Sequence, residues 1–271
     1  MEQIAPSRQE RRQSISRILD HLHTDGIQQV VPYLKMPTGQ SLAFCDGAWW
    51  QVSPFIAGTP LDRPRYLHDA AKGEALAHFL GDLSRHAKRL PHDRGMPFFS
   101  LKEYILKLEQ DIGIHAHDVA PRFAPLFDFL RRSFMEAYDT LPVAFCHGDY
   151  HPLNIIWRGD AIAAVIDWEF CGFKADIYDA ANLVGCIGME HPSGLTDNLA
   201  AAFIGAMRES SAISAQSWNL FAEFVIALRF AWLAEWLRGK DREMIDLEED
   251  YMNLLVENMD RLKEAWGISG R

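Results

Sequence analysis

Two carboxylates and one amide near the middle of the chain have the residue types expected of a site that handles phosphate groups. The stretch CHGDYHPLNIIW, residues 146–157, carries Asp149 and Asn154, and a second aspartate follows at Asp167. Carboxylate and amide oxygens suit Mg²⁺, which binds one or two protein carboxylates together with substrate phosphates. Because Gly, Asp, Pro and Asn also form ordinary turns, this stretch taken alone is equally compatible with a simple loop.

The apolar runs that follow predict a β-hairpin that would bring these three side chains together. The runs IIW and AIAAVI, within residues 155–166, flank a compact Arg-Gly-Asp turn. Asn154 precedes the first strand and Asp167 follows the second. The two positions therefore lie at the open end of an antiparallel pair, where opposed Cβ atoms are about 5 Å apart. Asp149 belongs to the loop that enters the same end, so we expect one site rather than three unrelated turn caps.

The segments HGDYHPLN and VIDWE together resemble the catalytic loop and metal-binding segment of kinase-like phosphotransferases. His147, Asp149 and Asn154 match the spacing H-x-D-x-x-x-x-N, and Asp167 begins a D-W-E triplet where protein kinases have D-F-G. Gly148 and the absence of an A-P-E segment after Asp167 disfavour a protein kinase. The chain is instead similar, from about residue 8 onward, to the aminoglycoside phosphotransferase and choline kinase family, including its homoserine-kinase-like members.

This resemblance implies an α+β, protein-kinase-like fold and transfer of the γ-phosphate of ATP to a hydroxyl of a small molecule, with Mg²⁺. The acceptor would be a compound such as an aminoglycoside, choline or homoserine. The resemblance implies that Asp149 is the catalytic base and that Asn154 and Asp167 are the metal ligands. His147 would belong to the same catalytic loop and hydrogen-bond within it.

Two further regions take their expected roles from the same resemblance. The segment SPFIAG resembles the hinge between the lobes, where the backbone near Ser53, Pro54 and Phe55 would meet the adenine edge; a plain strand end is the alternative. Asp179 matches an aspartate that supports the catalytic loop. It also fits the first turn of a helix, where a carboxylate caps free N–H groups, and the sequence leaves both interpretations open.

Other metal and redox chemistry has little support in the sequence. His147 and His151 have the HxxxH spacing of helical zinc sites, but Gly148 and Pro152 make a helix improbable there. The four cysteines, Cys45, Cys146, Cys171 and Cys186, form no CxxC pair. We expect them to be reduced and mostly buried thiols.

The elements that must position the site divide into a small N-terminal lobe, residues 1–57, and a large helical C-terminal lobe, residues 58–271. Apolar residues at helical spacing predict a helix over about 8–25, followed by a small antiparallel sheet from the runs QVVPYLKM, SLAFC and AWWQVSPFI. An Asp-Gly pair between the last two runs indicates a hairpin turn. In the C-terminal lobe we expect a helix ending at Pro91, helices at 101–112 and 121–138, and about four from 176 onward, the last two at 215–239 and 241–266.

The N-terminal lobe departs from the family pattern. Family members carry a phosphate-covering hairpin and then a strand with a Lys or Arg that contacts the phosphates, all before the helix; here we expect no room for those strands. No G-x-G-x-x-G occurs, Lys35 follows the helix, and Glu10 would lack the lysine with which such a helix carboxylate pairs. Three explanations remain open: a wrong start or truncation, a natural short form, or a nucleotide- or metabolite-binding pseudo-enzyme of the same fold.

Composition limits the partners. The 271 residues carry a net charge of −10, which disfavours nucleic acid because phosphate backbones need a basic face. The N-terminal residues lack the apolar core of a signal peptide, and the longest apolar segment, 221–237, is interrupted by three charged residues. We therefore expect a cytoplasmic protein without a membrane partner. The oligomeric state is not predicted.

An acidic run late in the chain offers one weak hint about the acceptor. It comprises Asp246, Glu248, Glu249 and Asp250, and it could attract an amine-bearing substrate. Because it falls early in a predicted helix whose other side is apolar, a solvated helix face is the better interpretation.

Overall fold

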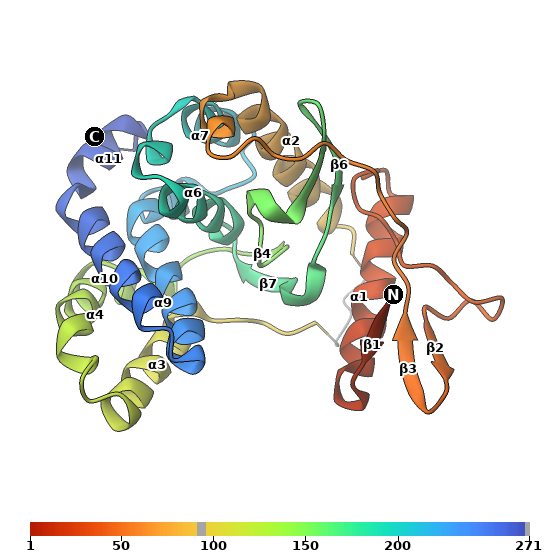
Figure 1. The fold of residues 1–271 in the computed structure, drawn as a ribbon. Coiled ribbons are helices and arrows are strands. Elements are labelled where there is room, and N and C mark those ends of the chain that lie inside the picture. Colours follow the sequence, from red (N-terminus) through yellow and green to blue (C-terminus); the bar gives the residue numbers. More distant parts are fainter. Residues whose placement is uncertain (91–95, 269–271) are drawn as a thin grey trace.

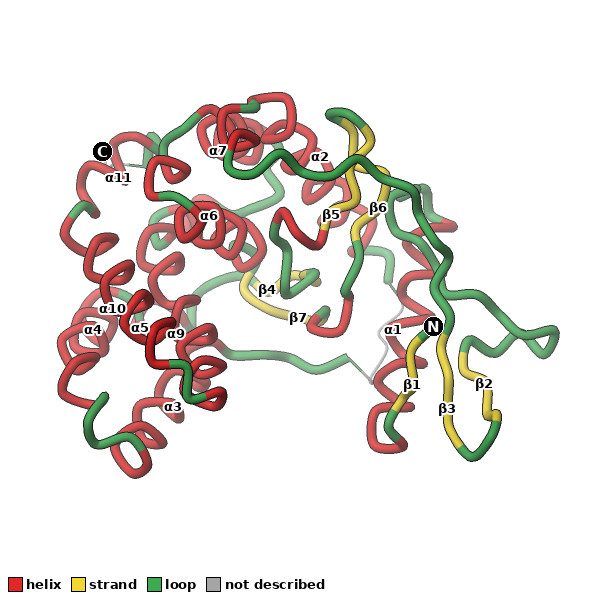
Figure 2. The backbone as a smooth tube through the Cα atoms, viewed as in Figure 1, coloured by secondary structure: helices red, strands yellow, loops and turns green. Residues whose placement is uncertain are grey.

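A small lobe of one helix and a three-stranded sheet lies beside a larger, mainly helical lobe in the computed structural model (Figure 1). The structure describes residues 1–90 and 96–268. Two short strand pairs, drawn in yellow in Figure 2, lie between the helices of the large lobe and the helix of the small one. The protein-kinase-like α+β prediction agrees with this architecture.

The small lobe contains the predicted hairpin and one unpredicted strand. Strands β1 (Glu2–Ile4), β2 (Leu42–Cys45) and β3 (Ala48–Gln51) form an antiparallel sheet in the order β1-β3-β2. Asp46 and Gly47 turn the chain between β2 and β3 with φ of 50° and 77°, as a tight hairpin requires. We expected no room before the helix for the hairpin and the lysine-bearing strand of the family. One short strand without a lysine, β1, does precede the helix, and it pairs with β3.

The run QVVPYLKM is not the strand that its apolar residues predicted. Among the described residues, it forms an isolated parallel bridge, from Val30 to Val165, and two backbone hydrogen bonds to distant segments, from Val165 to Gln29 and from Leu34 to Val52. Pro32 has no N–H to donate, which weakens continuous pairing through this run. The segment nevertheless ties the small lobe to the central hairpin.

Helix α1 (Gln9–Thr24) follows the predicted boundaries closely. Its buried side includes Ile15, Ile18, Leu19 and Leu22, at the spacing that predicted the helix. A left-handed residue, Gly26 with φ of 120°, follows its C-terminal end. The helix therefore presents one apolar side to the rest of the protein and leaves its first turns to polar contacts.

The large lobe is built from helices that pack pairwise around one apolar core. In chain order they are α2 (Ala70–Ala87), α3 (Leu101–His115), α4 (Ala120–Ser133), α5 (Met135–Tyr138), α6 (Tyr178–Glu190), α7 (Asn198–Glu209), α8 (Ala215–Trp218), α9 (Phe221–Gly239), α10 (Arg242–Glu257) and α11 (Met259–Ala265). Helix α2 packs along α7, and α9 packs against α6 and α10. The predicted helix at 121–138 breaks near Phe134, and the predicted end at Pro91 lies outside the described residues. None of the helices that the structure describes is both long and apolar enough to span a membrane.

The strands between the lobes carry the residues singled out by the sequence. The predicted hairpin is present as β5 (Ile155–Arg158) and β6 (Ala161–Val165), with Ile155 opposite Val165. The N–H of Ile166 donates to the carbonyl of Asn154 at 2.9 Å, so the pairing extends to the open end. A second, unpredicted pair, β4 (Val143–Cys146) and β7 (Gly172–Ala175), leads into the loop that contains Asp149.

Candidate active site

His147 is locked inside the loop that follows β4. Its side chain is fully buried; Nδ1 accepts from the N–H of Asp149 at 3.2 Å, and Nε2 lies 2.9 Å from the carbonyl oxygen of Ile166. Since Nδ1 accepts, Nε2 carries the proton and donates. Burial lowers the pKa of His147 to about 4, so the ring is neutral near pH 7. Both nitrogens are occupied, which leaves no ring atom for zinc and makes His147 a residue that shapes the loop.

Asp179 supports the same loop from the first turn of α6. Its Oδ2 accepts from the N–H of His147 at 2.6 Å, and its Oδ1 accepts from the N–H of Gly148 at 2.8 Å. Burial raises the pKa of Asp179 to about 6, although these two amides favour the ionised form. Of the two interpretations left open by the sequence, the contacts match support of the loop. Ile177, at the N-terminal cap position of α6, makes no side-chain capping hydrogen bond.

Gly148 fits where no other residue would. Its φ of 86° is left-handed, and a Cβ built on it would overlap the carbonyl oxygen of Phe170 and lie 3.0 Å from Nζ of Lys174. Lys174 itself is buried and donates to Phe170 at 2.6 Å. The glycine therefore allows the loop to lie directly against the segment that follows Asp167.

Asp149 and Asn154 are joined within the loop. The amide nitrogen of Asn154 donates to the backbone oxygen of Asp149 at 2.9 Å and to its Oδ2 at 3.0 Å; Nε2 of His151 lies 3.5 Å from the same Oδ2. Burial acts to raise the pKa of Asp149, but His151 and Asn154 outweigh it and hold the pKa below its usual range. Asp149 is therefore an ionised carboxylate at neutral pH, in a fixed orientation.

Asp167 completes the group at the end of the hairpin. It is a non-glycine residue in the left-handed region, with φ of 62°, a strained geometry that occurs often at functional sites. Burial raises its pKa, and the nearby charges of Asp149 and Glu169 raise it further. Two carboxylates that repel each other in this way form an environment that a cation would stabilise.

The donors fit a divalent cation held jointly with phosphate oxygens. Because the amide nitrogen of Asn154 is used on Asp149, its side-chain oxygen is the atom left for a metal, together with the carboxylate of Asp167. Within the described residues, no cluster of three or more His, Cys, Asp or Glu side chains could hold a metal ion. An oxygen site of two protein ligands agrees with Mg²⁺, which commonly takes its remaining ligands from water and phosphates.

The candidate hinge, residues 53–58, joins β3 to the central hairpin. Phe55 is 93% exposed, and the N–H of Thr59 donates to Trp157 at 2.7 Å just beyond the segment. Across the described chain, no backbone hydrogen bond reaches residues 53–58. Its backbone groups are thus available to a ligand, although Pro54 offers no N–H. Ser53 and Phe55 carry the N–H groups of the three residues predicted to contact adenine.

Arginines in the first turn of α1 and directly before it make contacts that the sequence did not predict. Arg8 pairs with Glu169 at 2.7 Å, and Arg11 donates to the backbone oxygens of Glu169 and Cys171. Arg12 pairs with Glu2 of β1 at 2.6 Å and approaches Glu169 at 3.4 Å. These contacts fix the segment after Asp167 against the small lobe. The helical period held a signal for Arg12, which precedes the buried Ile15 by three positions.

Glu10 and Lys35, which the sequence offered as a helix carboxylate and a lysine for the phosphate contact, take no part in the contacts between the arginines and Glu169. Glu10 is exposed on α1, and Lys35 pairs with Asp20 at 2.7 Å. Neither residue therefore supplies the helix carboxylate or the lysine that the family pattern would require.

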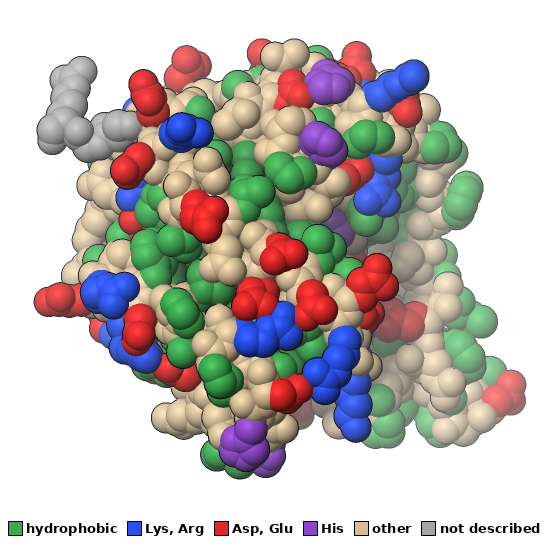
Figure 3. All heavy atoms as spheres, turned by 60° about the vertical axis from the view of Figure 1, so that its left-hand side comes forward, with side chains coloured by type: hydrophobic (Ala, Val, Ile, Leu, Met, Phe, Trp, Pro, Cys, Tyr) green, Lys and Arg blue, Asp and Glu red, His purple; other side chains and the backbone are tan. Residues whose placement is uncertain are grey.

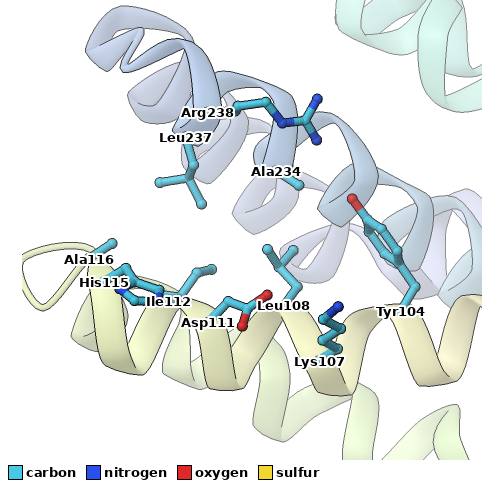
Figure 4. A pocket seen from close by; sticks show the side chains of 10 residues that line it. All are labelled: Tyr104, Lys107, Leu108, Asp111, Ile112, His115, Ala116, Ala234, Leu237 and Arg238. Atoms are coloured by element: carbon cyan, nitrogen blue, oxygen red, sulfur yellow. The ribbon is translucent and has the colours of Figure 1, made fainter. Parts of the chain in front are cut away.

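A cavity of about 590 Å³ lies away from this group, between α3 and α9 (Figure 4). Tyr104, Asp111 and Arg238 are among its lining side chains, and none of the predicted site residues lines it. A different part of α9 reaches the catalytic loop, since the ring of Trp232 lies 6.3 Å from that of His151.

Three of the four carboxylates in the acidic run near the start of α10 pair with basic side chains, and the fourth, Asp250, is exposed. Arg122 donates to Asp246 at 2.6 Å and to Glu249 at 2.7 Å, while Glu248 is fully buried against Arg229. Figure 3 shows acidic and basic side chains side by side on the face of the molecule that carries the left-hand helices of Figure 1. The run is therefore no free acidic patch. The expectation of a wholly solvated face is wrong for Glu248.

Comparison with known proteins assigns the family. The profile of the Phosphotransferase enzyme family matches residues 3–213, so the chain belongs to that family. A curated relative, the homoserine kinase of Nitrobacter winogradskyi, is 30% identical over 73% of this chain and 59% of its own length. The chain thus spans about three fifths of that relative.

Solved structures show the same fold. A microcompartment-associated aminopropanol kinase superposes with a TM-score of 0.66 at 18% identity, covering 98% of this chain and 86% of that structure. An amicoumacin kinase, solved in complex with AMP-PNP, Ca²⁺ and Ami, superposes with a TM-score of 0.65 at 15% identity, covering 88% of this chain and 76% of that structure. The predicted family and the kinase-like fold are therefore confirmed.

Proposed function

We propose that this protein transfers the γ-phosphate of ATP to a hydroxyl group of a small molecule, in a reaction that requires Mg²⁺. The observation that carries the proposal is the joining of Asp149 to Asn154, on a loop held by Asp179, at the hairpin end that Asp167 follows. Phosphoryl transfer asks a protein mainly to position its reactants and to neutralise charge. A rigid group of this composition suits that task.

Asp149 would act as the general base. Its pKa lies below the usual range, so it is ionised at neutral pH and able to accept the proton of an acceptor hydroxyl. The bond from Asn154 to Oδ2 orients the carboxylate. His147 and Asp179 would act through the backbone of the loop, holding Asp149 in place without touching the substrate.

Asn154 and Asp167 would hold Mg²⁺ through their side-chain oxygens. The bound ion would supply positive charge to the phosphate oxygens. The raised pKa of Asp167 and the orientation of Asn154 support this assignment. The unpaired backbone of residues 53–58 would bind the adenine edge, with Ser53 and Phe55 as the available N–H donors.

The acceptor would be an amine-bearing alcohol. The relatives named above are a homoserine kinase and an aminopropanol kinase, and both names denote small acceptors that carry an amine and a hydroxyl. In this chain, Trp232 and the stacked Trp236 form a half-buried aromatic pair beside His151. The guanidinium of Arg229 already lies over the ring of Trp232, at 5.7 Å, and the remaining aromatic surface would favour a cationic amine near the reacting hydroxyl.

Release of ADP from ATP and Mg²⁺, measured with homoserine, aminopropanol, choline and an aminoglycoside in turn, tests the proposal. At least one acceptor should raise the rate above ATP hydrolysis alone. Asp149→Asn should lower that rate by roughly 10²–10⁴-fold, the usual contribution of a general base. Asp250→Asn, an exposed aspartate of α10, is the matched control and should keep the rate. Equal rates in the two variants would remove Asp149 from its role.

A further inference from the structure

Between the small sheet and α1 lies a cluster of buried polar groups whose hydrogen bonds are incomplete. Gln51 is 2% exposed, and neither its amide nitrogen nor its amide oxygen has a partner. Arg12 is 6% exposed, and its Nε is also without a partner. A buried polar group that lacks a hydrogen bond costs on the order of 1–3 kcal/mol. Two such side chains in one place therefore indicate a missing ligand.

The sheet register places these two side chains around one carboxylate. Glu2 lies directly opposite Gln51 in the antiparallel pair of β1 and β3, so both side chains point to the same face of the sheet. Glu2 also pairs with Nη2 of Arg12 at 2.6 Å. Arg12 and Gln51 thus both border Glu2, on the face of the sheet that meets α1.

The cluster lies between the two regions already assigned to the nucleotide. Gln51 ends β3 and stands two residues before Ser53, where the candidate hinge begins. On the other side, Nη2 of Arg12 lies 3.4 Å from Glu169, two residues beyond Asp167. The charge of Arg12 also acts against the burial that raises the pKa of Asp167. Gln51 thus lies close in the chain to the candidate hinge, and Arg12 lies close in space to the segment that follows Asp167.

We propose that Arg12 and Gln51 bind a phosphate group of the nucleotide, with Nε of Arg12 and the amide nitrogen of Gln51 as donors. The inference rests on the proposed function and adds two residues to its nucleotide site. A guanidinium presents several N–H groups in a plane and suits phosphate oxygens well. In this protein the positive charge, on Arg12, lies on helix α1, and its carboxylate partner, Glu2, lies on strand β1. The small lobe would therefore contact a phosphate through Arg12 and without a lysine on a strand.

A purely structural role for the cluster makes a different prediction. If Arg12 only links β1 to the segment after Asp167, its loss should lower stability and leave nucleotide affinity unchanged. Arg8 provides the matched control, because it directly precedes α1 and pairs with the same Glu169, but with a largely exposed side chain. Gln51→Met is a second variant whose ADP affinity, rather than its stability, distinguishes the two roles. It removes an unsatisfied amide at nearly constant volume and should raise the melting temperature of the free protein under either role.

Calorimetric titration of ADP with Mg²⁺ decides between the two, using the full chain and the variants Arg12→Met, Gln51→Met and Arg8→Met. We expect Arg12→Met to weaken ADP binding by roughly 10- to 100-fold and Gln51→Met by about tenfold, as loss of charged and neutral hydrogen bonds implies. Arg8→Met should stay within about twofold, since exposed ion pairs contribute little. Adenosine, which lacks phosphate, should bind all four proteins alike.

Each other result has a definite meaning. Wild-type ADP affinity in folded Arg12→Met and Gln51→Met would overturn the inference while leaving the proposed function intact. An equal loss of adenosine binding would also overturn it, because the cluster would then bind the base. If Arg12→Met does not fold, Gln51→Met decides alone. Failure of the wild-type protein to bind ADP would overturn the proposed function, and the inference with it.

Discussion

The catalytic loop and the small lobe differ in how completely their polar groups are paired. In the loop, His147 uses both ring nitrogens and Asp179 uses both carboxylate oxygens. In the small lobe, Gln51 and Arg12 are buried with unpaired atoms, and Phe55 is almost fully exposed. The contacts that support the loop are complete without a ligand, whereas the small lobe keeps buried polar atoms without a partner. We infer that the chemical groups are preorganised and that the nucleotide finishes its own site.

Among the variants that test this difference between the loop and the small lobe, Gly148→Ala is expected to have the largest effect on stability. The new Cβ would overlap the Phe170 carbonyl in a left-handed backbone, so we expect a loss of about 2–4 kcal/mol in unfolding free energy and a marked loss of activity. The matched control is Gly159→Ala, in the hairpin turn. Its φ is 62°, but nothing lies within 4 Å of the added atom, so it should cost only about 1–2 kcal/mol. Equal losses in urea unfolding would contradict close packing at Gly148.

A second effect concerns the pH dependence of stability through Asp179. Burial raises its pKa in the folded state to about 6, above the value of an unfolded aspartate. The folded state therefore disfavours the ionised carboxylate more than the unfolded state does. The contribution of Asp179 to the free energy of unfolding should therefore fall by on the order of 3 kcal/mol as pH rises from about 4 to about 6, and it should stay constant above that pH. Asp179→Asn should lack this slope, which unfolding of both proteins across pH 4–7 would measure. Parallel curves would show that the carboxylate titrates normally.

The smallest effect is expected at the hinge, where the small lobe would use its backbone. Phe55→Ala should change stability by less than about 0.5 kcal/mol, because the ring is exposed. It should also leave ATP affinity within about twofold. Phe55→Pro removes the N–H and should weaken ATP binding by roughly tenfold. If Phe55→Ala weakens ATP as much as Phe55→Pro does, the side chain is the contact and the comparison needs revision.

The sequence predicted the central hairpin and its loop better than the small lobe, for physical reasons. The hairpin at 155–166 follows from local apolar runs around a turn, and it fixes where Asn154 and Asp167 lie. Strand β1 is three residues long and mostly polar, so no periodicity marks it. The contacts of Arg11 with Glu169 and Cys171 join residues about 160 positions apart, and no local pattern encodes such a pairing.

Asp179 shows a different limit. A carboxylate in the first turn of a helix can cap that helix or reach another loop, and the residue type is the same in both cases. Only the packing of α6 under the catalytic loop decides between them. Glu248 is similar, since its burial against Arg229 depends on how α9 meets α10.

The most direct test of the account is thermal unfolding with ATP, with and without Mg²⁺, for the wild-type protein and Asp167→Asn. At 100 times its dissociation constant, a ligand adds about 2.7 kcal/mol of stability, which corresponds to roughly 5 °C for a protein of this size. We predict a Mg²⁺-dependent rise of that order in the wild-type protein and its loss in Asp167→Asn. No rise in melting temperature, or the same rise in both proteins, would contradict a site in which Asp167 holds the Mg²⁺ that binds the phosphates of ATP.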